Sequence, residues 1–273
     1  MGLWLGVYSY LLTYLLLPYF LDMLVRGGLT TQNYRGQRIP EGAGIVIPVA
    51  AGLSLMSTLP FYWQQWEREG LIFLFLLTAV AFLGFLDDSL SYKGMKGLGG
   101  HLYYFFREGC LGTGLLKALG GISSAFFVSW ILSGDLYLFF LNGVLVSLSI
   151  NVLNLLDLRP GRAGKAFLLF MLLTFWHNNE SVPLFLLLAV TGAVLAYLPL
   201  DLQGQAMLGD TGANVLGAAA GMALFWSFTP GLKIIVVTFM VLLHLFCEGY
   251  SLSKIIEDVP WLDFLDRIGR PKI

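Results

Sequence analysis

The feature that most constrains this chain is a series of nine apolar stretches, each close to the length of a membrane-crossing helix. Such a helix needs about 20 mostly apolar residues, because the hydrocarbon core is about 30 Å thick and each residue rises about 1.5 Å. The stretches are 3–25, 42–59, 70–86, 112–132, 136–156, 164–176, 182–200, 209–228 and 232–252. Backbone groups in lipid must be hydrogen-bonded internally, so we expect an all-α, polytopic membrane protein with about nine transmembrane helices.

The composition agrees with this interpretation. Apolar residues make up 57% of the 273 residues, charged residues only 12%, and the mean hydropathy is +0.77. A water-soluble domain usually carries about twice that charged fraction. The net charge of −1 gives no bulk attraction to polyanions, so we expect no nucleic-acid partner. No repeat or linker divides the stretches, and residues 1–273 are expected to form one integral-membrane domain with a cytoplasmic tail at 253–273.

The placement of lysine and arginine predicts the orientation in the membrane. If the loops are assigned to the two sides alternately, one side holds fourteen of the sixteen basic residues, and the other holds only Arg68 and Lys233. Basic residues concentrate in cytoplasmic loops. We therefore expect an external N-terminus and a cytoplasmic C-terminus.

Four aspartates lie at the predicted cytoplasmic helix ends: Asp87, Asp88, Asp157 and Asp210. Ionisable residues near membrane spans cost free energy unless they are hydrated or paired, and these four could meet around one cation such as Mg²⁺. A simpler interpretation of Asp210 is that its charge favours a helix N-terminus. Asp87 and Asp88 end a helix, where negative charge is disfavoured, so a metal or a lysine such as Lys93 should compensate for them.

A polar stripe precedes Asp157. Asn151, Asn154 and Asp157 are spaced three residues apart, which places them on one face of a helix. An amide stripe can equally join neighbouring membrane helices by hydrogen bonds. Because this stripe ends in an acid and leads to Arg159 and Arg162, a site for phosphate oxygens is the alternative we favour.

Other motifs carry weaker signals. Gly217 and Gly221 form a GxxxG pattern, which predicts close helix packing and no catalytic role. His177 lies in an outer loop and His244 within the last apolar stretch, where a packing role is expected; His101, in a basic loop, is the one histidine worth testing. The sequence contains no nucleophile elbow, P-loop or dinucleotide fingerprint.

Together, the order of these motifs resembles the polyprenyl-phosphate N-acetylhexosamine-1-phosphate transferase superfamily. An Asp-Asp pair at 87–88 ends one helix, an Asn-x-x-Asn-x-x-Asp segment at 151–157 ends another, and Leu-Gly-Asp-Thr-Gly at 208–212 opens a later one. The basic segment 33–43 also resembles the family's first cytoplasmic loop. The superfamily includes the bacterial phospho-N-acetylmuramoyl-pentapeptide transferase and enzymes that move N-acetylglucosamine 1-phosphate onto undecaprenyl phosphate.

The resemblance implies a reaction in which a polyprenyl phosphate attacks the β-phosphate of a UDP-sugar and releases UMP. Asp87 would deprotonate or orient the lipid phosphate, and Asp88 would support it as a second catalytic residue. Asp210, with Asn154, would hold Mg²⁺, with Mn²⁺ as an alternative ion. The candidate substrate-binding residues are Asn151, Asp157, Arg159, Arg162, Arg38 and Lys93.

The same resemblance implies a cellular location. The protein would act in the bacterial cytoplasmic (inner) membrane, with its active site on the cytoplasmic face, in the first membrane step of cell-envelope polysaccharide synthesis. Its partners would be a polyprenyl phosphate and a nucleotide sugar. The sequence leaves open whether the protein forms a homodimer.

The chain departs from the family pattern at several points. Pro160 stands near a position where the family has a second acid, and Met207 where it commonly has an aromatic residue. Both positions resemble uracil-contacting ones. The histidine-rich loop after the last span is absent, so we expect a shortened member that acts on a simple N-acetylhexosamine rather than on the muramoyl pentapeptide. Arg267 and Arg270 of the tail either replace the loop's phosphate contacts or belong to an amphipathic tail anchored by apolar residues such as Trp261.

Two other classes of function compete with this prediction. A membrane transporter would need carboxylates near the bilayer midplane or inverted repeats with broken helices, whereas these acids lie at helix ends and no repeat is evident. A catalytically inactive family scaffold would fit the departures, but retention of all four acids argues against it.

Overall fold

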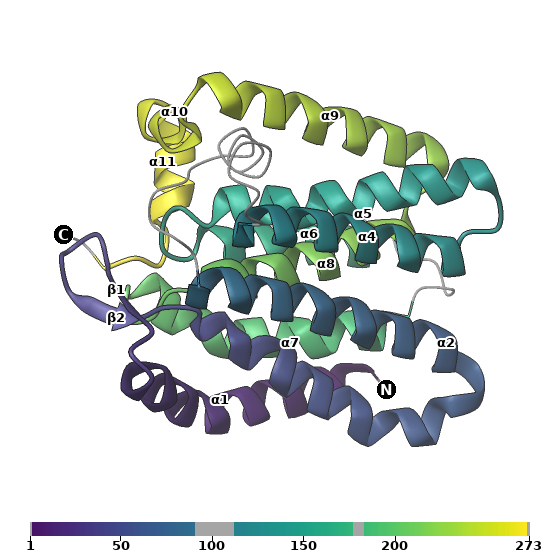
Figure 1. Ribbon diagram of the computed structural model, residues 1–273, viewed down its shortest axis with the longest axis horizontal. Helices are drawn as coiled ribbons and strands as arrows, with labels where there is room; N and C mark the ends of the chain where they lie inside the picture. The colour runs from purple at the N-terminus through teal and green to yellow at the C-terminus, as the bar shows by residue number, and fades with distance from the viewer. Residues whose placement is uncertain (1, 91–111, 177–182, 272–273) are drawn as a thin grey trace.

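The computed structural model describes residues 2–90, 112–176 and 183–271, without the side chains of residues 59, 60 and 62–67. The helices are α1 (Gly2–Arg26), α2 (Val46–Leu90), α4 (Thr113–Leu132), α5 (Leu136–Leu156), α6 (Arg162–Trp176), α7 (Leu184–Leu202), α8 (Gly209–Ser227), α9 (Pro230–Gly249), α10 (Leu252–Asp258) and α11 (Pro260–Arg267). A short 3-10 helix η1 (Ala43–Ile45) and two strands, β1 (Thr30–Gln32) and β2 (Arg38–Pro40), complete them. Figure 1 shows the long helices packed lengthwise into a bundle.

The helical content confirms the prediction of an all-α, polytopic membrane protein. In the part of the chain that the structure describes, six helical segments are long and apolar enough to cross a membrane: Gly2–Arg26, Arg68–Leu90, Thr113–Leu132, Leu136–Leu156, Leu184–Leu202 and Pro230–Gly249. The other three predicted stretches are helical too, but Ala43–Thr58 and the 15-residue α6 are short. The count of about nine spans and the orientation remain predictions.

The helix α2 accounts for two of the predicted stretches. It is one helical element of 45 residues, and Figure 1 shows that it leaves the hairpin end, bends and returns toward it. Its first half therefore corresponds to 42–59 and its second half to 70–86. The return brings Asp87 and Asp88 back to the end where the chain entered α2.

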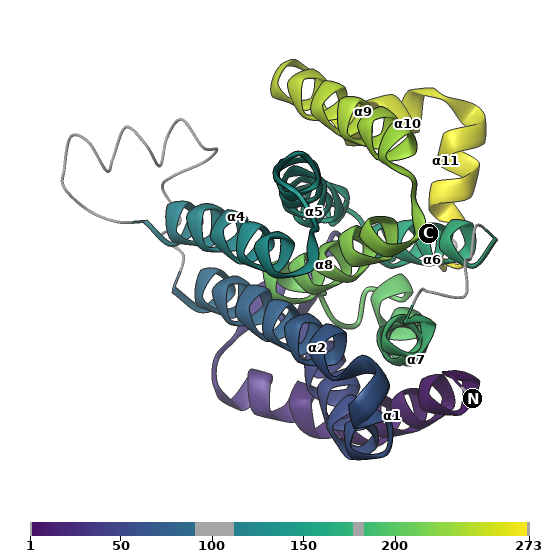
Figure 2. The same ribbon diagram turned by 90° about the vertical axis from the view of Figure 1, so that its right-hand side faces the viewer.

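The helix α8 occupies the centre of the bundle. All of its residues except Asp210 and Trp226 are buried, and Figure 2 shows it enclosed by the neighbouring helices. Its neighbours are other helices rather than lipid, and small residues allow these helices to pack closely against it. This explains why α8 is not among the six segments.

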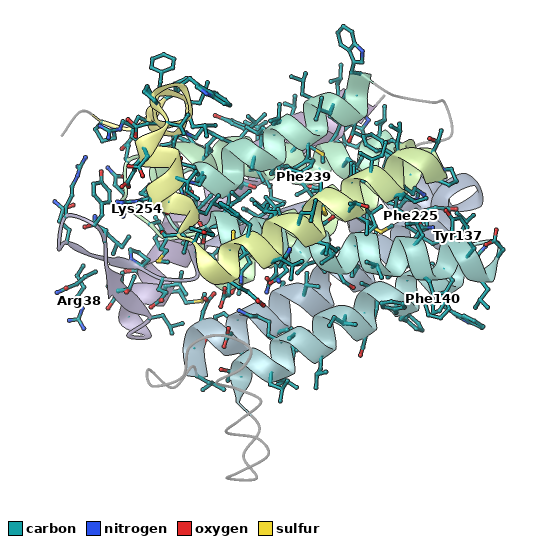
Figure 3. The ribbon with its side chains drawn as sticks, turned by 90° about the horizontal axis from the view of Figure 1, so that it is seen from above. Arg38, Tyr137, Phe140, Phe225, Phe239 and Lys254 are labelled. Carbon is teal, nitrogen blue, oxygen red and sulfur yellow. The ribbon has the colours of Figure 1, made fainter. Side chains whose placement is uncertain are left out.

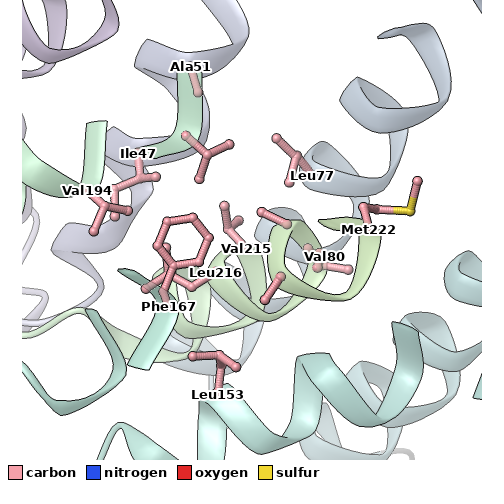
Figure 4. Close-up of a cluster of buried hydrophobic side chains, with 14 of the residues drawn as sticks. Ile47, Ala51, Leu77, Val80, Leu153, Phe167, Val194, Val215, Leu216 and Met222 are labelled. Atoms are coloured by element: carbon pink, nitrogen blue, oxygen red, sulfur yellow. The ribbon is translucent and has the colours of Figure 1, made fainter. Parts of the chain in front are cut away.

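Large side chains from the surrounding helices fill the space around α8. Leu77 of α2, Leu153 of α5, Phe167 of α6 and Val194 of α7 meet Leu216 of α8 in one buried cluster (Figure 4). Each of these side chains is at most 2% exposed. The packing ties four chain segments to the central helix and so fixes where α8 begins.

The start of α8 lies at the end of the bundle that carries the hairpin β1–β2 and the tail helices. The strands pair antiparallel, with Thr31 opposite Ile39. After β2 the chain pairs with the segment before α8: the Met207 amide donates to the Pro40 carbonyl (2.9 Å), and the Ala43 amide donates to the Met207 carbonyl (2.9 Å). The entry to α2 and the entry to α8 are thus held together.

The GxxxG pattern packs α8 against α5, as predicted. A Cβ atom added at Gly217 would lie 2.6 Å from the Ser149 carbonyl oxygen, and one at Gly221 would lie 3.0 Å from Val146 Cα. Only glycine permits this approach of the two backbones.

We therefore expect Gly217→Ala to lower the free energy of unfolding by about 1–3 kcal/mol, because the added methyl group overpacks the α5–α8 contact. The midpoint of thermal unfolding in detergent, followed by tryptophan fluorescence, measures the effect. Gly121→Ala is the control, since a Cβ atom at Gly121 of α4 would meet nothing within 4 Å. Equal midpoints for the two variants would contradict the packing argument.

Candidate active site

Two of the predicted aspartates meet at a lysine. The Lys117 ammonium lies 2.6 Å from an oxygen of Asp87 and 2.6 Å from an oxygen of Asp210. Asp87 ends α2, Lys117 lies in the first turns of α4, and Asp210 lies in the first turn of α8, so three helices converge here. Asp87 also accepts a hydrogen bond from Thr113. All three charged side chains are at most 28% exposed.

Asp88 has a different environment from Asp87. Its carboxylate accepts the backbone N–H groups of Asp210 (2.8 Å) and Thr211 (3.0 Å) and the Thr211 hydroxyl (2.6 Å). The N-cap residue of α8, Leu208, supplies no side-chain cap, so Asp88 of α2 caps α8 from another helix. Asp88 therefore holds the start of α8, with Asp210, against the end of α2.

These contacts compensate for the two negative charges that the sequence places at the C-terminal end of α2. Negative charge at the end of α2 is disfavoured, and Lys117 and the N-terminal amides of α8 compensate for Asp87 and Asp88 respectively. Lys93, predicted to help and to bind substrate, lies outside the described residues, as does His101.

Glycines allow the helices to meet this closely. A Cβ atom at Gly84 of α2 would lie 2.6 Å from the Asp210 carbonyl oxygen. Gly209 has φ +72°, and a Cβ atom there would lie 2.7 Å from Oδ2 of Asp88. A larger residue at either position would separate the two carboxylate-bearing helix ends.

Asp157 lies beside this cluster at the end of α5. It is half-buried, and its carboxylate accepts a hydrogen bond from the backbone of Gly209. Burial, together with the charges of Asp201, Asp210 and Asp88, raises the pKa of Asp157 well above its usual value. Asp157 thus keeps its proton to higher pH than an exposed aspartate and adds less negative charge to the site.

The two asparagines of the stripe behave differently. Asn151 Nδ2 lies 2.7 Å from Nε2 of His244 on α9, and Nδ1 of His244 lies 2.7 Å from the Met240 carbonyl oxygen. The carbonyl accepts, so Nδ1 carries the proton and Nε2 accepts from the amide. Asn151 therefore joins α5 to α9, which is the helix-joining alternative. Asn154 is half-buried, and its side chain bonds to no residue that the structure describes.

The predicted phosphate-binding arginines are engaged by the C-terminal tail. Arg159 pairs with Glu257 at 2.5 Å, and both side chains are about 40% exposed. Arg162 is 5% exposed and forms a bidentate pair with Asp266. Arg162 is thus occupied and buried, whereas Arg159 remains accessible.

Arg38 lies on the hairpin, at the same end of the molecule as the tail. Figure 3 shows Arg38 and Lys254 at this end and Tyr137 and Phe140 at the other. The Arg38 side chain is exposed. It contributes positive charge to this end of the bundle without a contact to the aspartates.

The donor set at the cluster fits a divalent cation with few protein ligands. Within the described ranges, no three His, Cys, Asp or Glu side chains form a metal-binding group, so the four acids do not converge on one point. Asp87 and Asp210, however, already share one cationic group. Mg²⁺ typically takes one or two protein carboxylates and fills its other positions with phosphates and water.

Two cavities border the loop that follows Asp157. The smaller has a volume of about 170 Å³ and is lined by residues that include Asp157, Met207, Tyr34, Arg159 and Pro160. The larger has a volume of about 830 Å³ and shares Tyr34, Arg159 and Pro160 with the smaller. The loop after α5 therefore borders both.

Two charged residues of this site, Lys117 and Asp201, are not among those predicted from the sequence. Lys117 is the single charged residue of the stretch 112–132, and that isolation was a usable signal. Asp201, at the end of α7, is 4% exposed and accepts the Gly161 N–H at 3.0 Å. It is a further acid at a helix end on the same side.

The fold and the site define a polytopic membrane protein with a carboxylate–lysine cluster at one end of its helical bundle. No family model matches the chain. Proteins named phospho-N-acetylmuramoyl-pentapeptide-transferase are similar to it: one from Wolbachia pipientis wMel is 25% identical over 238 residues, covering 78% of this chain and 71% of that protein. One from Streptococcus pneumoniae (strain 70585) is 25% identical over 253 residues, covering 82% and 74%. One from Oceanobacillus iheyensis is 25% identical over 241 residues, covering 78% and 71%.

These relatives confirm the resemblance that the motifs indicated. The chain is similar over most of its length to the polyprenyl-phosphate N-acetylhexosamine-1-phosphate transferase superfamily. The similarity spans the segments that carry the cluster, since it covers about four fifths of the chain.

We expect Asp88→Ala to lower the free energy of unfolding by about 1–3 kcal/mol, because two backbone N–H groups and the Thr211 hydroxyl lose their acceptor. Thermal unfolding of the purified protein measures the change. Asp22→Ala serves as control, since Asp22 is 57% exposed and pairs with the exposed Arg26. An Asp88→Ala midpoint equal to that of the control would contradict the capping role.

Proposed function

We propose that the protein transfers a sugar 1-phosphate from a UDP-sugar to a polyprenyl phosphate such as undecaprenyl phosphate. The sugar phosphate that we propose is N-acetylhexosamine 1-phosphate. The observation that carries the proposal is the cluster of Asp87, Lys117 and Asp210 on three converging helices. Phosphoryl transfer depends mainly on positioning and on neutralisation of phosphate charge, and a carboxylate–lysine cluster supplies both. The names of the relatives support the same class of reaction.

The proposed reaction joins the lipid phosphate to the donor. An oxygen of the polyprenyl phosphate attacks the β-phosphorus of the UDP-sugar, the bond from this phosphorus to the bridging oxygen breaks, and UMP leaves. Asp87 accepts a proton from the lipid phosphate or orients it. Direct attack is favoured over an aspartyl-phosphate intermediate, because the acceptor phosphate is already a competent nucleophile.

Lys117 supplies the fixed positive charge of the site. The first amides of α8 are taken by Asp88, so they are not free to bind the diphosphate. The Lys117 ammonium lies between Asp87 and Asp210 and faces both groups that would border the phosphates. A diphosphate bound there would exchange one carboxylate partner of Lys117 for a phosphate oxygen.

Asp210, with the amide oxygen of Asn154, would hold Mg²⁺ in this proposal. The ion would supply charge neutralisation on the diphosphate. Asn154 suits this role because its side chain has no partner within the described part of the chain, whereas Asn151 is bound to His244. Mn²⁺ has the same preference for oxygen ligands and is the alternative ion.

We also propose how the protein lies in the membrane. Nine spans would leave the N-terminus outside and the C-terminus in the cytoplasm of a bacterium, with the cluster on the cytoplasmic face of the inner membrane. The tail reaches the hairpin end of the bundle, since Tyr34 of the hairpin and Pro271 of the tail line one cavity, and Arg38 and Lys254 lie at the same end (Figure 3). That end supports the cytoplasmic assignment, because basic residues favour the cytoplasmic side.

We expect Asp87→Asn and Asp210→Asn each to lower the rate of transfer by about 10²–10⁴-fold, because each removes a charged oxygen at the reacting phosphates. The assay uses the protein in liposomes with UDP-N-acetylglucosamine labelled in the sugar and with undecaprenyl phosphate, and it counts label in the extracted lipid.

Asp135→Asn is the matched control. Asp135 caps the other end of the bundle at α5 by accepting the Leu138 N–H, and asparagine caps a helix equally well. The control should retain the wild-type rate. Full activity of the Asp87 or Asp210 variant would refute the assignment of the site, and solute flux without lipid product would favour a transporter.

Removal of divalent cations with a chelator should abolish transfer, since the diphosphate charge would no longer be neutralised. Mg²⁺ added in excess should restore it, and Mn²⁺ should do so in part. Transfer that persists after chelation and dialysis would show that Asp210 and Asn154 do not serve as metal ligands.

A further inference from the structure

The C-terminal tail is fixed to the bundle by a buried group of ion pairs. Arg162 of α6 donates to both carboxylate oxygens of Asp266 at 2.8 and 2.9 Å, and Arg270 donates to the same two oxygens at 3.0 and 2.9 Å. The side chains of all three are at most 13% exposed. Burial alone would raise the pKa of Asp266, but the hydrogen bonds from the two arginines outweigh it and lower the pKa to about 2. The group is therefore charged throughout the physiological pH range.

Arg270 of this group, together with Asp201 of α7, also holds the loop after α5. Arg270 Nε donates to the Pro160 carbonyl at 2.7 Å, and Asp201 accepts the Gly161 N–H at 3.0 Å. Lys165 adds a bond from its ammonium to the Asp266 carbonyl at 2.5 Å. Loop and tail thus fix each other, and the loop is the segment that carries Asp157 and Arg159.

The larger cavity lies between this loop, the hairpin and α11. Its volume is about 830 Å³, and its walls include Tyr34 of the hairpin, Phe264 of α11, and Arg159 and Arg267. It shares the wall residues Tyr34, Arg159 and Pro160 with the smaller cavity, which Asp157 lines. The two cavities therefore adjoin at the loop after α5, with Asp157 in the wall of the smaller one and the tail in the wall of the larger one.

The walls suit a phosphorylated nucleoside. Aromatic rings such as Tyr34 and Phe264 offer flat faces for a base, and guanidinium groups bind phosphate oxygens in pairs. Arg159 pairs with Glu257, and Arg267 pairs with Asp263. Both acids are partly exposed, and such pairs are weak enough to exchange for a phosphate. Phe264 is 68% exposed, so its ring is accessible from the cavity that it lines.

We propose that the tail, residues 251–271, builds the nucleotide end of the donor site: the cavity between Tyr34 and Phe264 receives the nucleoside monophosphate portion, and Asp266 is the positioning residue that holds the cavity walls together. This inference rests on the proposed function, and it assigns the donor's orientation within it. The sugar phosphate then points toward Asp87 and Asp210, and the base points toward α11.

The test measures binding of labelled UMP to the full-length protein in lipid nanodiscs by equilibrium dialysis with Mg²⁺ present. Phe264→Ala should weaken UMP binding about ten-fold, because a base loses its stacking partner. Trp261→Ala is the matched control: Trp261 lies on the same helix, is 64% exposed and is not among the cavity walls. Its affinity for UMP should equal that of the wild type.

Asp266→Asn tests the positioning role. We expect it to raise KM for the UDP-sugar about ten-fold and to leave KM for the polyprenyl phosphate unchanged, since the lipid does not enter this cavity. Asp266→Glu, which keeps the charge, should recover part of the loss. A purely structural role would change both KM values together or reduce kcat alone, and that result would overturn the positioning role.

The outcomes separate the two proposals. If the wild type transfers no sugar phosphate, the proposed function fails. If it does transfer and Phe264→Ala binds UMP as tightly as Trp261→Ala, only the present inference fails. Loss of N-acetylglucosamine 1-phosphate binding in Phe264→Ala, with UMP binding intact, would reverse the orientation and overturn the assignment.

Discussion

The placement of two adjacent carboxylates at the end of α2 is the constraint on which this site depends. The electrostatics of a helix C-terminus disfavour negative charge, so the pair requires positive partners from elsewhere in the fold. Lys117 of α4 provides one and the N-terminal amides of α8 provide the other, through Asp87 and Asp88 respectively. Satisfying both acids brings three helix ends together and delivers Asp210 to Lys117. The interactions that stabilise the meeting point of these helices also assemble the candidate active site.

In the tail, a buried group of ion pairs compensates for the charge of a buried arginine. Burying Arg162 without a partner would be costly, and Asp266 removes that cost by accepting four hydrogen bonds from Arg162 and Arg270. The result is a rigid wall beside the loop that carries Asp157 and Arg159. A segment that is charged and amphipathic in the sequence thereby becomes part of a cavity wall.

Much of the fold can be predicted from the sequence, because helices and their ends depend on the apolar and charged residues within one short segment. Helices form over the predicted apolar stretches, although 42–59 and 70–86 belong to the single helix α2, and the packing role of Gly217 is found as predicted. The count of about nine spans stays a prediction. Contacts between distant segments could not be predicted in this way. No local pattern indicates that Asp88 caps α8, that Asn151 bonds to His244, or that Arg162 is buried against Asp266. Lys117 was detectable as a lone charge in an apolar stretch, but its two partners follow only from the packing of three helices.

The central claim is that this cluster joins a sugar phosphate to a polyprenyl phosphate. Mass spectrometry of the lipid fraction, after the protein in liposomes is supplied with undecaprenyl phosphate, Mg²⁺ and a panel of UDP-sugars, tests it most directly. The account predicts a polyprenyl diphosphate that carries one N-acetylhexosamine, with UMP released in equal amount. Folded protein that forms no such lipid from any donor in the panel would contradict it.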